Sequence, residues 1–303
     1  MIINLKEAKK ILDNHGVIGL PTETVYGLAA KFDDIVALEK IYHLKNRPKA
    51  NPLIVHVASL AQASMLSAIA LPEFLTHFWP GPLTVILPAK ACIPEIARAE
   101  LSTIALRMPN HKQARDLLEA VGPLAAPSAN LSGTPSSTKP EHIESDFGKD
   151  FPILEGEPSI AGLESTIIAP SGKDWVLLRE GSTTRESLEE WITLVESSHT
   201  PPCPGTRFRH YAPQAQLLDG KRPAQIEAAI GFEGRSYPFA KKVYFLGKLE
   251  NPEEVGHNLY ALLRKLDTDG VKKAWIDFDF PKTGLLRTVH ERLQKSKASC
   301  INR

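Results

Sequence analysis

Short apolar runs alternate with amphipathic stretches along most of the chain, and this alternation constrains the fold more than any other feature. The runs VIGL (17–20), LIVHV (53–57) and TIALR (103–107) have the length of buried strands. The stretch DIVALEKIYHLK (34–45) repeats apolar residues every three to four positions, which predicts a helix. Such alternation, followed by a cluster of strands, predicts a large α/β domain over a twisted mixed sheet. The later strands are expected near 151–154, 165–169 and 175–179.

Two of the expected helices begin with capping residues. Asn4 with Glu7 three positions later has the spacing of a capping box and predicts a helix over 5–14. Thr183 with Glu186 has the same spacing and predicts the helix that closes the large domain.

A proline-rich stretch divides the chain. Residues 197–213 hold four prolines and no acidic residue, and they lack a helical or strand period, which is typical of a linker or a lid. We therefore expect a large domain over 1–196 and a small domain over 214–303. In the small domain strands and helices alternate again, which predicts a parallel, three-layer α/β domain. Its strands are expected at 215–219, 242–247 and 273–278, and its helices at 223–230, 253–266 and 285–294.

Composition argues against several classes of protein. The 36 Lys and Arg balance 35 Asp and Glu, so the net charge of +1 disfavours a generic polyanion binder, which needs a basic excess. Cys92, Cys203 and Cys300 lie far apart, which disfavours a disulfide framework or a zinc site. The charged, helical start and the lack of an apolar run near ~20 residues predict a cytoplasmic protein that does not enter a membrane.

The segment KNRPKANPLIVHV (45–57) gathers cations without an intervening acid. Lys45 and Arg47 lie two positions apart beside two prolines, which predicts extended chain with both side chains on one side. A guanidinium fork beside an ammonium suits a polyphosphate. The alternative, a solvated basic turn, is commoner for an isolated pair of this kind.

Other polar segments follow buried strands, where open α/β sheets place their ligands. PTETVYGLAA (21–30) follows one strand, and Arg107 ends another, where it needs an anion or carbonyls as partners. APSANLSGTPSS (126–137) is crowded with small hydroxyl residues, a composition that can close on a phosphate. Ser165 and Arg179 lie at further strand ends. Each segment also has a purely structural interpretation, such as a surface turn or an ion pair, so none is decisive alone.

The sequence lacks the common motifs for nucleotide binding and for nucleophilic or metal-dependent catalysis. It contains no GxGxxG and no GxxxxGK[ST]. Nothing in it resembles a Ser-His-Asp triad, an HExxH helix or a close pair of carboxylates. Hydrolysis by a protein nucleophile is therefore not expected.

Taken together and in order, the segments resemble the YrdC-type domain of threonylcarbamoyl-adenylate synthases. The resemblance covers roughly residues 4–195, and PGTRFRHYAP (204–213) with the small domain is similar to the two-domain form of that family. Two features depart from the pattern: Thr206 and Phe208 stand where Met and Tyr are expected, and the small domain is short. The matching blocks are PTETVYGLAA, KNRP with NPLIVHV, WPGPLT, ALRMP, APSANLSG, and STI with LREG.

The resemblance implies a concave basic cavity in which ATP, L-threonine and bicarbonate (or CO2) give threonylcarbamoyl-adenylate and pyrophosphate. Mg²⁺ would arrive with ATP, without protein ligands. The product would pass to a tRNA-modifying transferase complex, with weak RNA binding as an accessory property. Lys45 and Arg47 are the implied catalytic residues. The implied nucleotide site comprises Lys45, Arg47, Asn51, Thr103, Ser128, Asn130, Ser136, Arg179 and Tyr211. The implied L-threonine site comprises Thr24, His56, Arg107, the backbone at Ala126, and Ser165.

Three alternatives remain open at this stage. The first is an RNA-binding module in which the basic segment grips a phosphate backbone. The second is a carbamoyl-adenylate enzyme of hydrogenase maturation, although the zinc-finger and acylphosphatase segments of that family do not appear here. The third is that the small domain has a purely structural role.

Overall fold

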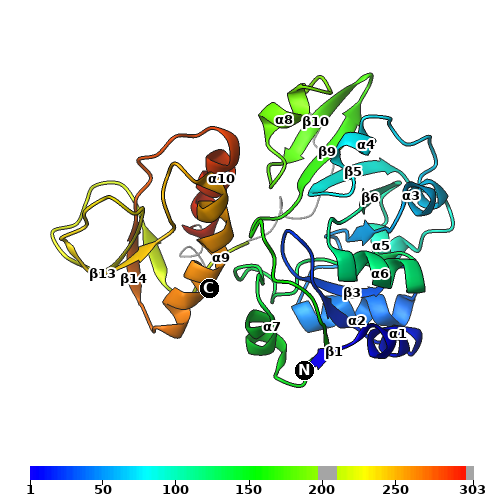
Figure 1. Cartoon of the computed structure of the whole chain (residues 1–303), viewed down its shortest axis with the longest axis horizontal. Coiled ribbons are helices and arrows are strands. Elements are labelled where there is room, and N and C mark those ends of the chain that lie inside the picture. The colour runs from blue at the N-terminus through cyan, green and yellow to red at the C-terminus, as the bar shows by residue number, and fades with distance from the viewer. Residues whose placement is uncertain (197–209, 298–303) are drawn as a thin grey trace.

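The computed structural model describes residues 1–196 and 210–297, which form two α/β domains lying side by side (Figure 1). The predicted linker, including Thr206 and Phe208, lies mostly outside the described residues, so the expected domain limits remain a prediction. None of the described helices combines the length and hydropathy that a membrane span requires.

A mixed sheet of ten strands forms the centre of the large domain, as predicted. Its strands in spatial order are β1 (Ile2–Ile3), β8 (Ile153–Leu154), β2 (Ile18–Leu20), β3 (Gly27–Lys31), β7 (Leu124–Ala125), β4 (Ile54–His56), β6 (Thr103–Arg107), β5 (Leu83–Pro88), β9 (Thr166–Ser171) and β10 (Asp174–Arg179). The pairs β4–β6 and β5–β9 are parallel, whereas β3–β7 and β9–β10 are antiparallel. Fully buried residues such as Val55, Leu106 and Ile168 contribute to the hydrophobic core.

Helices connect these strands, and the predicted capping box is confirmed. The Asn4 side chain accepts the Glu7 amide at 3.0 Å, and the Asn4 amide donates to the Glu7 carboxylate at 2.9 Å. The last helix begins one residue later than predicted, because Thr184 rather than Thr183 accepts the capping hydrogen bond. The helices are α1 (Leu5–Asp13), α2 (Ile35–Lys45), α3 (Leu60–Leu66), α4 (Leu75–Phe78), α5 (Glu95–Arg98), α6 (Lys112–Val121), α7 (Pro140–Phe147) and α8 (Arg185–Glu189).

The expectation of extended chain at Lys45 and Arg47 is wrong. Lys45 is the last residue of α2, and Asn46 caps that helix in the left-handed conformation, with φ of 49° and ψ of 43°. Asn tolerates this conformation better than most residues because its side chain can bond locally. Because of this left-handed cap, Lys45 and Arg47 point in different directions and contact different carbonyl groups.

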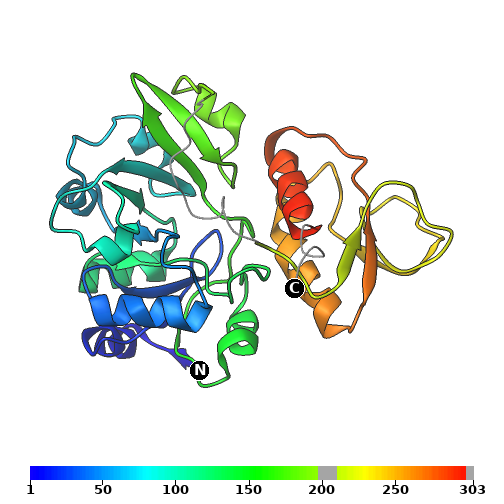
Figure 2. The ribbon, with the colours of Figure 1, turned by 180° about the vertical axis from the view of Figure 1, so that it is seen from behind.

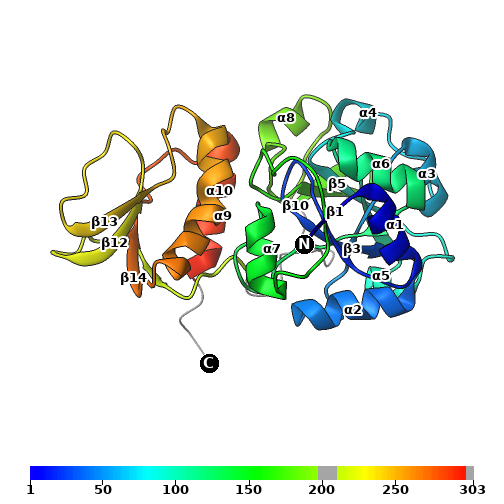
Figure 3. The same ribbon diagram turned by 60° about the horizontal axis from the view of Figure 1, so that its bottom comes forward.

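The small domain is built on a parallel sheet, as predicted. In spatial order its strands are β11 (Gln216–Leu218), β14 (Lys273–Ile276), β12 (Ile226–Gly231) and β13 (Ala240–Phe245). Two helices, α9 (Pro252–Thr268) and α10 (Gly284–Lys297), lie on the face of this sheet that is turned toward the large domain (Figures 2 and 3).

The prediction of a helix over 223–230 is wrong, since residues 226–231 form β12. Ala228, Ala229 and Ile230 are fully buried on this strand, which lies between β13 and β14. A short apolar run that is buried on both faces has no period that separates a parallel strand from a helix. Consequently, the described part of the small domain has one helical layer rather than the two that a three-layer domain requires.

Candidate active site

A pocket lies in the large domain where several strand ends meet. The parallel neighbours β4 and β6 end side by side, with His56 and Arg107 as register partners. The antiparallel pairing of β9 and β10 brings Arg179 against Ser165. Strand ends are where open α/β sheets place their ligands. The lining residues are Thr22, Thr24, Val25, Tyr26, Gly27, Arg47, Pro52, Ile54, His56, Arg107, Ala126, Pro127, Ser128, Asn130, Thr134, Ser136, Glu164, Ser165, Arg179, His210 and Tyr211.

Guanidinium groups from separate elements line this pocket. Arg47, which follows α2, donates through Nε to the Asn51 carbonyl at 3.1 Å and through a terminal nitrogen to the Pro52 carbonyl at 2.7 Å. Arg179 donates to the Ser165 carbonyl at 2.8 Å and to the Ser165 hydroxyl at 3.1 Å. Burial, together with the nearby Arg179, lowers the pKa of Arg47 to about 10, so the group stays charged at neutral pH.

The third guanidinium, Arg107, is paired with an acid that the sequence analysis did not single out. Its terminal nitrogen lies 2.7 Å from Oε1 of Glu23, and its Nε donates to the Gly81 carbonyl at 3.3 Å. Burial and the charge of Arg107 lower the pKa of the adjacent His56 to about 3, so this imidazole is neutral near pH 7. A substrate carboxylate that reaches Arg107 must therefore share the guanidinium with Glu23.

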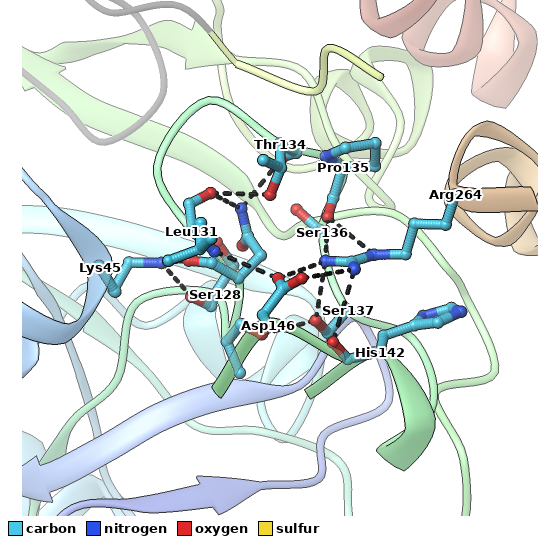
Figure 4. A network of polar contacts seen from close by, with 12 residues as sticks. Lys45, Ser128, Leu131, Thr134, Pro135, Ser136, Ser137, His142, Asp146 and Arg264 are labelled. Carbon is cyan, nitrogen blue, oxygen red and sulfur yellow. Dashed lines mark hydrogen bonds and ion pairs between the residues drawn. The ribbon is translucent and has the colours of Figure 1, made fainter. Parts of the chain in front are cut away.

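Lys45 points toward the beginning of the loop 128–137 and is not a lining residue of the pocket (Figure 4). Its Nζ donates to the carbonyls of Ser128 and Asn130. Burial, with the charge of Arg47 nearby, holds the pKa of Lys45 well below its ordinary value. The observed contacts of Lys45 support the backbone of a pocket loop.

Glu164 is an acidic lining residue of the pocket, next to Ser165. One carboxylate oxygen accepts the Ser136 hydroxyl at 2.7 Å, and the other accepts the Tyr260 hydroxyl at 2.7 Å and Nε of Arg292 at 3.0 Å. Burial alone would raise the pKa of Glu164, but the charges of Arg292 and Arg179, with the hydrogen bonds from Ser136 and Tyr260, lower it to about 2. Tyr211 stacks on Tyr260 with ring centres 5.4 Å apart, and the Arg292 guanidinium lies 5.1 Å from the Tyr211 ring centre.

Most of the predicted site residues lie around this one pocket, but three do not line it. Lys45 supports the loop from behind, and Asn51 is buried behind Arg47. Thr103 begins β6, and strand geometry places it about 13 Å from Arg107 on the same face. A ligand must extend along β6 to touch both. The predicted residues that line the pocket are Thr24, Arg47, His56, Arg107, Ala126, Ser128, Asn130, Ser136, Ser165, Arg179 and Tyr211.

Glu164 and His210 are the main lining residues that the sequence analysis missed. Glu164 directly precedes Ser165 in the segment ESTIIA (164–169), and an acid beside a buried apolar strand needs partners, which was a signal in the sequence. Burial, followed by the charge of Arg47, lowers the pKa of His210 to about 4, so its imidazole is neutral near pH 7.

The arrangement suits charge stabilisation better than nucleophilic catalysis. The Ser136 hydroxyl is held by Glu164, and the Ser165 hydroxyl lies 2.7 Å from Thr84 Oγ1, so neither is paired with an imidazole in the described hydrogen bonds. A serine nucleophile needs an adjacent base to take its proton. A cluster of guanidinium groups in a partly closed pocket instead attracts and orients an anion.

Comparisons with known proteins identify the family. Residues 10–181 match the Sua5/YciO/YrdC family model, described as telomere recombination, and residues 183–298 match the model of the threonylcarbamoyl-AMP synthase C-terminal domain. The chain is 37% identical to a threonylcarbamoyl-AMP synthase of Pyrococcus abyssi, over 92% of this chain and 90% of the relative. It is also 37% identical to the enzyme of that name from Bacillus subtilis, over 99% of this chain and 94% of the relative.

A solved structure agrees with these matches. The crystal structure of P. abyssi Sua5 complexed with L-threonine superposes with a TM-score of 0.88 at 34% identity, covering 98% of both chains. The likeness therefore extends through the large and the small domain.

Proposed function

This chain belongs to the threonylcarbamoyl-AMP synthase family, and we propose that its pocket joins L-threonine, bicarbonate (or CO2) and ATP into threonylcarbamoyl-AMP and pyrophosphate. The substrates supply their own nucleophiles. Bicarbonate takes up a proton and loses water to give carbon dioxide, the free amine of threonine attacks the carbon, and the amine proton passes to solvent water to leave a carbamate. A carbamate oxygen then attacks the α-phosphorus of ATP, and pyrophosphate leaves. The protein positions the reactants and stabilises the developing charge.

One observation supports this proposal most strongly: Arg47, Arg107 and Arg179 come from separate elements and line the same pocket. A triphosphate and an amino-acid carboxylate are the anions that the reaction must hold together. Planar guanidinium groups match phosphate and carboxylate oxygens with paired hydrogen bonds.

For ATP, we propose that Arg47 and Arg179 contact phosphate oxygens, with Ser128, Asn130 and Ser136 on the facing loop. Lys45 then acts mainly through the loop carbonyls that it holds. Tyr211 covers the site from its position against the small domain. Asn51 and Thr103, which do not line the pocket, are the weakest members of the predicted nucleotide set.

For L-threonine, we propose that the amino acid lies at the adjacent ends of β4 and β6, with its carboxylate on Arg107. Thr24, Ser165 and the backbone at Ala126 are the proposed polar neighbours. The neutral His56 imidazole adds a hydrogen-bonding group without adding charge. The pairing of Arg107 with Glu23 implies that threonine binding rearranges this ion pair.

We further propose that Mg²⁺ enters with ATP, held by phosphate oxygens and water. The lining carboxylate Glu164 is already engaged by three donors, which favours this arrangement. The product would serve a tRNA-modifying transferase complex in the cytoplasm, and RNA binding would be weak and accessory.

Pyrophosphate release by the whole 303-residue chain tests the proposal. We expect release that requires ATP, L-threonine and bicarbonate together, because each supplies part of the product. Release that does not depend on threonine and bicarbonate would contradict the proposal. RNA binding with a steep salt dependence and no ATP turnover would instead favour the RNA-binding alternative.

A further inference from the structure

Helix α9 of the small domain reaches into the large domain with two side chains one turn apart. Tyr260 and Arg264 lie four positions apart, so they project from the same face of the helix. Their partners in the large domain lie on or beside the loop 128–137, which carries several lining residues of the pocket.

Arg264 holds this loop at two points (Figure 4). Its Nε and a terminal nitrogen donate to the Pro135 carbonyl at 3.1 and 2.7 Å. The guanidinium also forms an ion pair with Asp146, with contacts of 2.9 and 2.7 Å. Asp146 in turn accepts the Leu131 amide at 3.2 Å. One guanidinium from the small domain therefore connects residues near both ends of the segment 131–135.

Tyr260 reaches the next residue of the loop through Glu164. The Tyr260 hydroxyl donates to one oxygen of this carboxylate, and the Ser136 hydroxyl donates to the other, each at 2.7 Å. Ser136 directly follows the Pro135 carbonyl that Arg264 holds. From the large-domain side, Lys45 holds the carbonyls of Ser128 and Asn130. The loop is thus held from the large domain near its start and from the small domain near its end.

These contacts are largely shielded from water. The Arg264 and Asp146 side chains are 12% and 10% exposed, and Glu164 is 6% exposed. Hydrogen bonds to charged groups are worth more than neutral ones, and loss of one partner leaves the other buried and unsatisfied. Such contacts can therefore set the conformation of a loop as well as join two domains.

We propose that Arg264 and Tyr260 are positioning residues through which the small domain orders the nucleotide-binding loop 128–137. The proposal rests on the proposed function, in which this loop contacts ATP. It gives the small domain a defined part in substrate binding, in contrast to the purely structural alternative. Neither residue lines the pocket, so both act through Pro135, Asp146 and Glu164.

The test compares ligand affinities of two-domain variants of this chain by calorimetric titration with ATP and, separately, with L-threonine. We expect Arg264→Ala to raise the Kd for ATP at least fivefold while the Kd for L-threonine changes less than twofold. Tyr260→Phe keeps the ring that stacks on Tyr211 but loses the hydroxyl, and it should raise the Kd for ATP about threefold. This second variant keeps the test decisive if Arg264→Ala does not fold.

Arg287→Ala is the matched control, because Arg287 also joins the two domains. It pairs with Glu186 at 2.7 Å and with Glu180 at 3.6 Å, without touching the loop. We expect its Kd for ATP to equal that of the wild type. Unchanged ATP affinity in both test variants, or an equal loss in the control, would overturn the proposal. Because binding is measured without turnover, failure of the proposed reaction would be seen separately, as wild-type protein that releases no pyrophosphate.

Discussion

At the scale of single residues, burial determines which pocket groups carry charge. The pKa of Arg47 falls to about 10, yet the group remains a cation at neutral pH. The pKa values of His56 and His210 fall to about 3 and about 4, so both imidazoles are neutral there. Positive charge on the pocket wall therefore comes from guanidinium groups, which suits a site that must hold a triphosphate.

Sequence reasoning could find the cations but not all of their partners. Arg107 was predictable because a cation at the end of an apolar strand requires a partner. Its pairing with Glu23 was not, because two side chains from distant segments meet only in the folded chain. The contacts of Lys45 with the carbonyls of Ser128 and Asn130 could not be predicted from the sequence either, because these residues are also far apart in the chain.

Replacing Arg47 tests the role of the guanidinium groups. We expect Arg47→Ala to lower the rate of ATP-dependent adenylate formation at least tenfold, or about 1.4 kcal/mol of transition-state stabilisation. Lys49→Ala is the control, since Lys49 is an exposed neighbour whose Nζ lies 3.5 Å from Glu39. Pyrophosphate release measures both rates, and thermal melting checks that both variants fold. A near-normal rate for Arg47→Ala would remove this residue from the site.

At the scale of elements, helices and strands with a clear local signal could be predicted from the sequence, whereas those with an ambiguous signal could not. The helix at α1 was predictable from its capping box, and the parallel sheet of the small domain from alternating strands and helices. The strand β12 was not, because its buried run of Ala and Ile fits a short helix equally well. The left-handed cap at Asn46 was also missed, because the prolines after it favoured extended chain.

Gly181, which follows β10, packs closely against the backbone of residues 164–166, and two of these residues line the pocket. This contact offers a test at the scale of elements. A Cβ at Gly181 would lie 2.4 Å from the Glu164 carbonyl oxygen and 2.5 Å from the Thr166 amide nitrogen. We expect Gly181→Ala to lower the free energy of unfolding by about 1–3 kcal/mol, because backbone atoms must move. Adenylate formation should also fall, since Glu164 and Ser165 line the pocket.

Denaturant unfolding measures this effect. The control is Lys173→Ala, an exposed position in the turn between β9 and β10, which should leave stability nearly unchanged. Wild-type stability in Gly181→Ala would mean that the two segments are not packed this closely.

At the scale of the whole molecule, the pocket depends on both domains. The large domain supplies most of the lining, while Tyr260 and Arg292 of the small domain hold Glu164. The sequence indicated two domains but not their contact surface, because the residues that meet there are about a hundred or more positions apart. For the same reason, Arg264 and Arg292 could not be recognised in advance as neighbours of the nucleotide loop.

A crystal structure of the protein with a non-hydrolysable ATP analogue and L-threonine tests the central claim most directly. We predict that the triphosphate lies between Arg47 and Arg179, with the amino acid beside it and its carboxylate on Arg107. Ligands bound elsewhere, with these three guanidinium groups turned to bulk water, would contradict the account.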